Sequence, residues 1–263
     1  MTPSPLKTET STHVRILTLD HPPSRNALSE AMLGALLAAI DAASVDTKIH
    51  AVVLQANGSA FCAGHDMKQL TAHRSDADRG RAYFTEIMTQ CAEVMQAIVR
   101  CPKPFVAAVE GVATAAGCQL VATCDLAVAG ENAKFATPGV NIGLFCSTPM
   151  VALSRNVSRK RAMEMLLLGE MLDAQSAADH GLVNRVVPQD RVRAEALAMA
   201  EMIASKSPVT VAIGKQAFYA QLEQPLAEAY ADAAAVMVRN MLERDAAEGI
   251  GAFIEKRTPK WGG

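Results

Sequence analysis

Two short stretches of small residues carry the chemistry that this sequence suggests. Residues 61–68 read F-C-A-G-H-D-M-K, and residues 113–120 read A-T-A-A-G-C-Q-L. Both have the pattern of a strand that turns into a helix, where the first backbone N–H groups are free to bind an oxygen atom. Two such turns side by side would form an oxyanion hole, which stabilises negative charge as it develops on a carbonyl oxygen.

Three side chains in these stretches extend the candidate site. His65 could donate a hydrogen bond to a ligand or carry a proton, although a bond to a loop carbonyl would also explain it. Asp66 could orient His65, but it also fits as the N-cap of a short helix that starts at residue 67. Gln119 stands where a water-activating carboxylate would be useful, and an amide cannot accept a proton at neutral pH.

The elements that must position these turns alternate between strands and helices. Helices are predicted over 29–43, with Ser29 as the N-cap, and over 83–100 and 115–123. Alternating or short apolar runs predict strands over 14–19, 51–55, 105–109, 126–129, 134–136 and 183–187. Strands that alternate with helices indicate an α/β fold.

The pattern from residue 191 onward is mainly helical. Helices are predicted over 191–205, 208–221, 225–242 and 246–256, with Pro208 and Pro225 in first turns. We therefore expect a flexible arm over 1–12, an α/β core over 13–200 and a helical C-terminal region over 201–263. The apolar positions of that last region exceed the needs of one exposed helix face, which predicts an oligomer interface.

The composition argues against several classes of protein. Apolar residues make up 50% of the 263, and 25 basic against 27 acidic residues give no global field that would attract nucleic acid or a membrane. The six cysteines have no C-x-x-C pair and no histidine at zinc spacing, so we expect reduced, packed thiols and no metal site. Residues 1–12 are polar and lack a targeting pattern, which predicts a cytoplasmic location.

Five motifs in order resemble the enoyl-CoA hydratase/isomerase family, the crotonase superfamily. They are S-R-N-A-L-S at 24–29, F-C-A-G-H-D-M-K at 61–68, P-K-P-F-V-A-A-V-E-G at 102–111, A-A-G-C-Q-L-V-A-T-C-D at 115–125 and G-L-V-N-R-V-V at 181–187. The similarity is greatest to the branch known as enoyl-CoA hydratase domain-containing proteins. The resemblance implies a ClpP-like spiral of β-β-α units, a helical C-terminal trimerisation region, and homotrimers or dimers of trimers.

The resemblance also implies an acyl-CoA substrate whose thioester oxygen accepts two backbone N–H bonds, from Ala63 and Ala116 by motif position. Coenzyme A is part of that substrate, so no separate cofactor is expected. Lys68, Arg25 and Lys256 are candidates for contacts with its phosphates. The residues expected to line the substrate are Arg25, Ala27, Leu28, Ala63, His65, Asp66, Met67, Ala115, Ala116, Pro138, Leu144 and Cys146.

The chain departs from the family's hydratases at two catalytic positions. Those enzymes hold a water molecule between two glutamates, and the matching positions here are Gln119 and Gly139. A positioned acid or base contributes about 10² to 10⁴ in rate, so we expect poor hydratase turnover. Two alternatives stay open: decarboxylation of a methylmalonyl-CoA type substrate with the help of His65, and acyl-CoA binding without catalysis.

Overall fold

The computed structural model describes residues 4–262, and two β-sheets lie at its centre. The larger sheet has six strands in the order β1-β2-β3-β5-β7-β10, and the smaller has four in the order β4-β6-β8-β9. The larger sheet consists of β1 (Leu6–Ser11), β2 (Val14–Leu19), β3 (Ala51–Ala56), β5 (Phe105–Val109), β7 (Leu126–Gly130) and β10 (Arg185–Val187). The smaller consists of β4 (Ala60–Cys62), β6 (Val112–Thr114), β8 (Lys134–Ala136) and β9 (Leu172–Asp173).

The chain moves between the two sheets in a regular way. The pairs β3 and β4, β5 and β6, and β7 and β8 each place one strand in the larger sheet and the next in the smaller sheet, and helices follow each pair. This confirms the predicted α/β spiral of β-β-α units. Both turns of the candidate site lie where a strand of the smaller sheet ends, after β4 and after β6.

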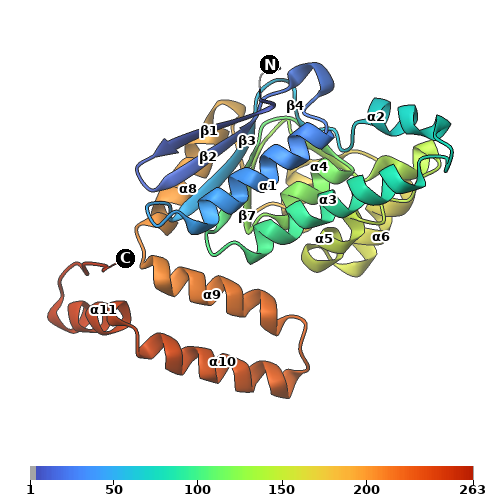
Figure 1. Ribbon diagram of the computed structural model, residues 1–263. Helices are drawn as coiled ribbons and strands as arrows, with labels where there is room; N and C mark the ends of the chain where they lie inside the picture. The colour runs from blue at the N-terminus through green and yellow to red at the C-terminus, as the bar shows by residue number, and fades with distance from the viewer. Residues whose placement is uncertain (1–3, 263) are drawn as a thin grey trace.

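Helices cover both faces of the larger sheet (Figure 1). Helices α1 (Glu30–Val45) and α3 (Arg81–Arg100) pack against the main core, and α8 (Val192–Ala204) packs on the opposite face. Alternation along β3 explains this, because Val52 and Leu54 join the main core whereas Val53 contacts the α8 side. The remaining helices of the core are α2 (Met67–Ala72), α4 (Ala116–Thr123), α5 (Pro149–Asn156), α6 (Arg159–Leu168) and α7 (Ala174–Asp179).

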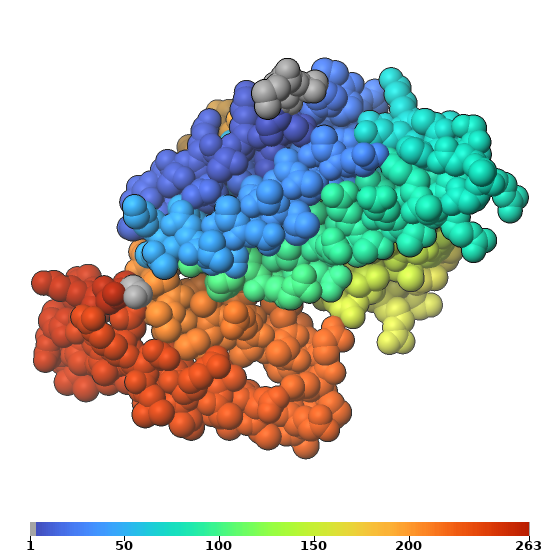
Figure 2. Space-filling model, in the orientation of Figure 1, coloured from blue at the N-terminus to red at the C-terminus, as the bar shows by residue number. Residues whose placement is uncertain are grey.

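Three helices form an extension that stands off from the core: α9 (Pro208–Gln221), α10 (Leu226–Met241) and α11 (Arg244–Glu255). In Figure 2 this extension, coloured orange to red, projects below the blue and green part of the molecule. A buried ion pair anchors α9, because Lys215 Nζ lies 2.7 Å from Asp125 Oδ2 and the Tyr219 hydroxyl donates to Asp125 Oδ1 at 2.9 Å.

The prediction of a flexible arm is wrong for part of its length. Residues 6–11 form β1, which pairs in antiparallel register with β2, while residues 1–3 lie outside the described range. Most side chains of β1 are exposed. This edge strand therefore has the polar composition of a loop, although its backbone is paired with β2.

The structure also adds elements that the sequence pattern did not predict. Helices α5, α6 and α7 occupy the segment between the predicted strands at 134–136 and 183–187. Within residues 4–262, no single helix is long and apolar enough to cross a membrane, and one bent pair, 189–204 with 208–221, meets that test by length and composition.

Candidate functional site

The first turn of the candidate site follows β4 and lies against the loop at residues 25–28. The Ala63 N–H donates to the Arg25 carbonyl oxygen at 3.1 Å, and the Leu28 N–H donates to the Gly64 carbonyl oxygen at 2.8 Å. The predicted role of Ala63 as an oxyanion donor is therefore wrong, because its N–H is already bonded within the protein. The predicted proximity of the two loops is correct.

His65 supplies a free N–H in this turn. It forms an isolated parallel bridge with Leu28, and its own N–H has no acceptor among the described residues. Gly64, which precedes it, has a φ of +90°, a conformation that favours glycine and aims the next peptide group away from the strand direction.

The second turn follows β6 and starts α4. The Ala115 N–H donates to the Ala136 carbonyl oxygen at 2.9 Å, and Ala116 is the first helical residue, with no acceptor for its N–H within residues 4–262. Ala115 has a φ of 51° and a ψ of −119°, which strains a residue with a side chain. The strained residue directs the free N–H of Ala116 out of the helix N-terminus, where the helix dipole favours negative charge.

The two turns are in direct contact. A Cβ atom on Gly64 would lie 3.0 Å from the Ala115 Cβ and 3.3 Å from the Ala116 nitrogen. The Thr114 hydroxyl also donates to the Ala63 carbonyl oxygen at 3.2 Å and ties the turns together. Two free N–H groups on such closely packed segments can bind a single oxygen atom.

Position 139, which the resemblance matches to the second glutamate of the hydratases, has no room for a side chain. A Cβ atom on Gly139 would lie 2.7 Å from the Leu144 carbonyl oxygen and 2.9 Å from Cys146 Sγ. The Leu144 N–H donates back to the Gly139 carbonyl oxygen at 2.9 Å and holds the loop in this shape. The local backbone therefore excludes a carboxylate side chain at position 139.

The side chain of Gln119 points into protein and is only 5% exposed. Its Oε1 atom is buried without a hydrogen-bond partner among the described residues. Gln119 lies one helical turn after the proposed donor region, because its N–H donates to the carbonyl oxygen of Ala115 at 3.0 Å. This agrees with its predicted position near the oxyanion donors.

His65 and Asp66 do not act as a pair in this structure. The Asp66 carboxylate accepts from the backbone N–H groups of Lys68 at 2.9 Å and Gln69 at 3.3 Å, which confirms it as the N-cap of α2. The Nε2 atom of His65 is buried and unpartnered, and burial lowers the pKa of its imidazole. A neutral imidazole donates a hydrogen bond from one ring nitrogen and accepts one at the other.

The remaining predicted residues divide into buried and exposed groups. Leu28 is fully buried, while Arg25 and Leu144 are exposed on the surrounding loops and Met67 is exposed at the start of α2. Pro138 and Cys146 flank the closed loop at Gly139. Lys256 is the C-cap of α11, which lies at the opposite end of the molecule from α2 in Figure 1, so it is not brought to the site of its own chain.

The cysteines have the properties of packed thiols. All six are free and buried, and burial raises the pKa of Cys62, Cys91 and Cys118 to about 12. A thiol with a raised pKa is a weak nucleophile at neutral pH.

Thr137 is a residue of this region that the sequence analysis missed. It is completely buried, and its Oγ1 atom has no hydrogen-bond partner among residues 4–262. The available signal was a polar residue between a buried strand and Pro138.

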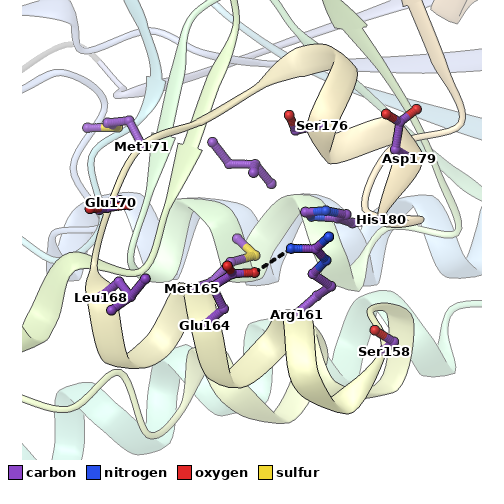
Figure 3. Close-up of a pocket in the computed structure, with 11 residues that line it drawn as sticks. Ser158, Arg161, Glu164, Met165, Leu168, Glu170, Met171, Ser176, Asp179 and His180 are labelled. Carbon is purple, nitrogen blue, oxygen red and sulfur yellow. Dashed lines mark hydrogen bonds and ion pairs between the residues drawn. The ribbon is translucent and has the colours of Figure 1, made fainter.

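A groove of about 620 Å³ lies apart from these residues, between α6 and α7 (Figure 3). An ion pair of 2.8 Å joins Arg161 and Glu164 at its polar end, close to His180, while Leu168 and Met171 line the other end. The groove includes none of the predicted site residues.

Comparisons with known proteins place this geometry in a family. The sequence model described as enoyl-CoA hydratase/isomerase matches residues 9–263. Enoyl-CoA hydratase domain-containing protein 3 of Rattus norvegicus is 51% identical over 94% of this chain and 81% of its own length. The crystal structure of an enoyl-CoA hydratase of Mycobacterium smegmatis has a TM-score of 0.93 and 50% identity, with 98% of this chain and 99% of that chain covered.

A solved human structure agrees with these matches. It is titled enoyl-CoA hydratase domain-containing protein 3, has a TM-score of 0.93 and 46% identity, and covers 98% of this chain and all of its own.

The comparisons also correct the predicted location. Five relatives that share the name enoyl-CoA hydratase domain-containing protein 3, at 44% to 51% identity, are named mitochondrial proteins. The prediction of a cytoplasmic location is wrong by this finding, because it depended only on the composition of residues 1–12. The fold, the two turns and the matches together show that the chain belongs to the enoyl-CoA hydratase/isomerase family.

Proposed function

We propose that this protein binds an acyl-CoA thioester and stabilises negative charge on its carbonyl oxygen with the backbone N–H groups of His65 and Ala116. The single observation that carries the proposal is that these two N–H groups have no acceptor in the described part of the chain and lie on turns in direct contact. One donor of this kind contributes about 10² to 10³ in rate, because it is aimed where charge develops.

The small residues of both turns suit a substrate that approaches the backbone. Ala63 and Ala115 are only half-buried, and the Cβ atoms of alanine leave room for a thioester beside the two N–H groups. Arg25 and Lys68 are exposed at the edge of the same loops, where their charges would meet the phosphates of coenzyme A. The enolate of the thioester is the species that this arrangement would stabilise.

The proposed chemistry does not include efficient hydration of an enoyl-CoA. Hydration needs groups that deliver and remove protons, and neither the Gln119 amide nor Gly139 supplies one. His65 supplies one of the two proposed N–H donors and its Nε2 atom is unpartnered among the described residues, so we assign to its imidazole any proton transfer that occurs there.

A panel of coenzyme A esters tests this function. Mass spectrometry would follow crotonyl-, 3-hydroxybutyryl-, 3-enoyl-, methylmalonyl- and malonyl-CoA with the wild type and the His65→Ala variant. His180→Ala is the matched control, because His180 lies in the groove between α6 and α7. We expect ester binding throughout, crotonyl-CoA hydration far below that of a working hydratase, and any turnover to depend on His65.

Other results would redirect the proposal. Loss of carbon dioxide from methylmalonyl- or malonyl-CoA would assign the protein as a decarboxylase. Binding of every ester without any product would assign it as an acyl-CoA binding protein. Absence of ester binding would contradict the proposed function itself.

The proposed assembly is a homo-oligomer, a trimer or a dimer of trimers, formed through the helical extension. Leu242 and Phe253 are 83% and 84% exposed, and Tyr230 is 72% exposed, although all three carry large apolar side chains. Such an apolar surface is typical of a subunit interface. Light scattering at micromolar concentration should give a multiple of the 27.8 kDa chain mass, and a monomer would contradict this.

A further inference from the structure

The side chain of Asn26 joins three backbone segments beside the first turn of the proposed site. Its Nδ2 atom donates to the carbonyl oxygens of Asn57 and Ala60, each at 2.8 Å, and its Oδ1 atom accepts from the His21 N–H at 2.8 Å. Asn26 is 0% exposed, so solvent does not compete for these bonds. Both amide hydrogens and the amide oxygen are therefore used, which makes this side chain a complete three-way link.

The backbone at this position depends on such a link. Arg25 and Asn26 both have a φ of +54°, in the left-handed region that residues with side chains rarely adopt. Asparagine tolerates this region better than most residues, whereas arginine does not. A strained conformation of this kind persists only where the surrounding structure holds it. The three side-chain bonds of Asn26 supply that restraint.

The loop at residues 25–28 decides which N–H of the first turn is free. The Arg25 carbonyl oxygen accepts from the Ala63 N–H at 3.1 Å, and the Leu28 N–H donates to the Gly64 carbonyl oxygen at 2.8 Å. These contacts lie on either side of the buried asparagine in the chain. They occupy the N–H of Ala63 and leave the next N–H that points toward the site, that of His65, without an acceptor among the described residues.

The bond from Asn26 to Ala60 connects this loop to the strand that carries the turn. Ala60 is the first residue of β4 (Ala60–Cys62), and Ala63 follows the strand directly. The loop is therefore fixed to β4 at both ends, by the side chain of Asn26 where the strand begins and by the Arg25 carbonyl oxygen where it ends. A loop held in this way cannot slide along the turn.

We propose that Asn26 is a positioning residue for the oxyanion hole. Its side chain holds Arg25 in place, Arg25 captures the Ala63 N–H, and the His65 N–H is thereby aimed at the thioester oxygen. The inference rests on the proposed acyl-CoA function and names a residue on which its geometry depends. Asn26 itself is buried and does not touch the substrate.

Replacement of Asn26 by glycine tests the inference cleanly. Glycine accepts a φ of +54° without strain, so Asn26→Gly removes the three side-chain bonds and no more than that from the backbone. Infrared spectra of carbonyl-labelled butyryl-CoA report the effect. In the wild type the bound carbonyl band should move to lower frequency, and in Asn26→Gly it should move about half as far, because one of two donors is misplaced.

Asn156→Ala is the matched control for this experiment. The Asn156 Nδ2 atom also donates to two carbonyl oxygens, those of Ala122 at 2.8 Å and Ala152 at 2.9 Å, but it ties α5 to the C-terminal end of α4. Its band should match that of the wild type. An equal reduction of the shift in both variants would overturn the inference, because loss of any buried asparagine link would then be sufficient.

A second variant and a second readout cover the case in which Asn26→Gly does not fold. Asn26→Asp keeps the volume and the acceptor for the His21 N–H but replaces the donor to Asn57 and Ala60, and it should reduce the band shift in the same direction. Hydrogen exchange of the wild type needs no variant. The Ala63 N–H should exchange as slowly as the amides of β3, and a rate about tenfold or more above theirs would overturn the inference, because the loop would then open on its own.

The spectra separate the inference from the proposed function. A wild-type shift that persists in full in the folded Asn26 variants would overturn the role of Asn26 and leave the acyl-CoA function standing, even if the variants unfold at a lower temperature. A carbonyl band that does not move in the wild type, or butyryl-CoA that does not bind, would overturn the proposed function and the role of Asn26 with it.

Discussion

The Ala116 nitrogen lies 3.3 Å from the point where a Cβ atom on Gly64 would be. The space beside this N–H is therefore kept open by the absence of one methyl group in the neighbouring turn. Gly64 also has a φ of +90°, so glycine at this position serves both the backbone conformation and the access to Ala116. The shape of the first turn at Gly64 therefore determines whether a ligand can reach the N–H of Ala116 in the second turn.

Replacement of Gly64 by alanine should disable the site. The new methyl group would crowd the Ala116 N–H, and we expect kcat/KM on any turned-over ester to fall by about 10² or more, the value of one oxyanion donor. Gly143→Ala is the matched control, because Gly143 also has a positive φ of +76° but no atom within 4 Å of its Cβ position. Equal losses in both variants would show that backbone strain alone is responsible.

Introduction of a glutamate at position 139 should not create a hydratase. Its Cβ alone would be 2.7 Å from the Leu144 carbonyl oxygen, and we expect Gly139→Glu to lower the free energy of unfolding by about 1 to 3 kcal/mol. The double variant that combines Gln119→Glu with Gly139→Glu should also hydrate crotonyl-CoA slowly. Hydration at the rate of a working hydratase in a stable double variant would contradict the steric argument.

Removal of the Lys215 ammonium should detach the helical extension from the core. Lys215 is 8% exposed and donates to Asp125 and to the carbonyl oxygens of Ile98 at 2.9 Å and Lys103 at 3.0 Å. Lys215→Met leaves Asp125 without its cation, which should cost about 3 to 5 kcal/mol in urea unfolding. The exposed Lys206 gives the control variant Lys206→Met, for which a loss of similar size would show that the ion pair is not the cause.

The stability of the protein should fall in mild acid, partly through His65. Burial lowers the pKa of His65 in the folded state, so the unfolded chain binds the proton more readily and folding loses free energy as pH falls below about 6.5. His65→Gln should therefore show a smaller loss of unfolding free energy in this range. Above about pH 8, where histidine is neutral in both states, the two proteins should respond to pH alike. Identical acid profiles would exclude a contribution from His65.

Local patterns were sufficient to predict most of the fold. The sequence predicted the strand at 105–109 with its observed bounds, and the caps by Ser29 and Asp66 are present as expected. Patterning fails for β1, since an exposed edge strand depends on a partner strand that its own residues do not reveal. It also fails for α6, because large apolar side chains such as Leu167 are exposed there and the sequence lacks a clear division into an apolar and a polar helix face.

The candidate site was predictable by region but not by atom. Runs of small residues were enough to predict the two turns. The choice between Ala63 and His65 as the donor was not predictable, because it depends on the Arg25 carbonyl oxygen, which accepts the Ala63 N–H. That contact joins residues 38 positions apart and follows from tertiary structure alone. The unpartnered hydroxyl of Thr137 is likewise invisible until the strands are assembled.

The polarisation of the thioester carbonyl is the most direct test of the account. Infrared difference spectra of butyryl-CoA, isotope-labelled at the carbonyl carbon, would be recorded free and bound to the wild type and to Gly64→Ala. Two hydrogen bonds from His65 and Ala116 should move the carbonyl stretch to lower frequency in the wild type and much less in the variant. An unchanged carbonyl band at saturating wild-type protein would contradict the proposed oxyanion hole.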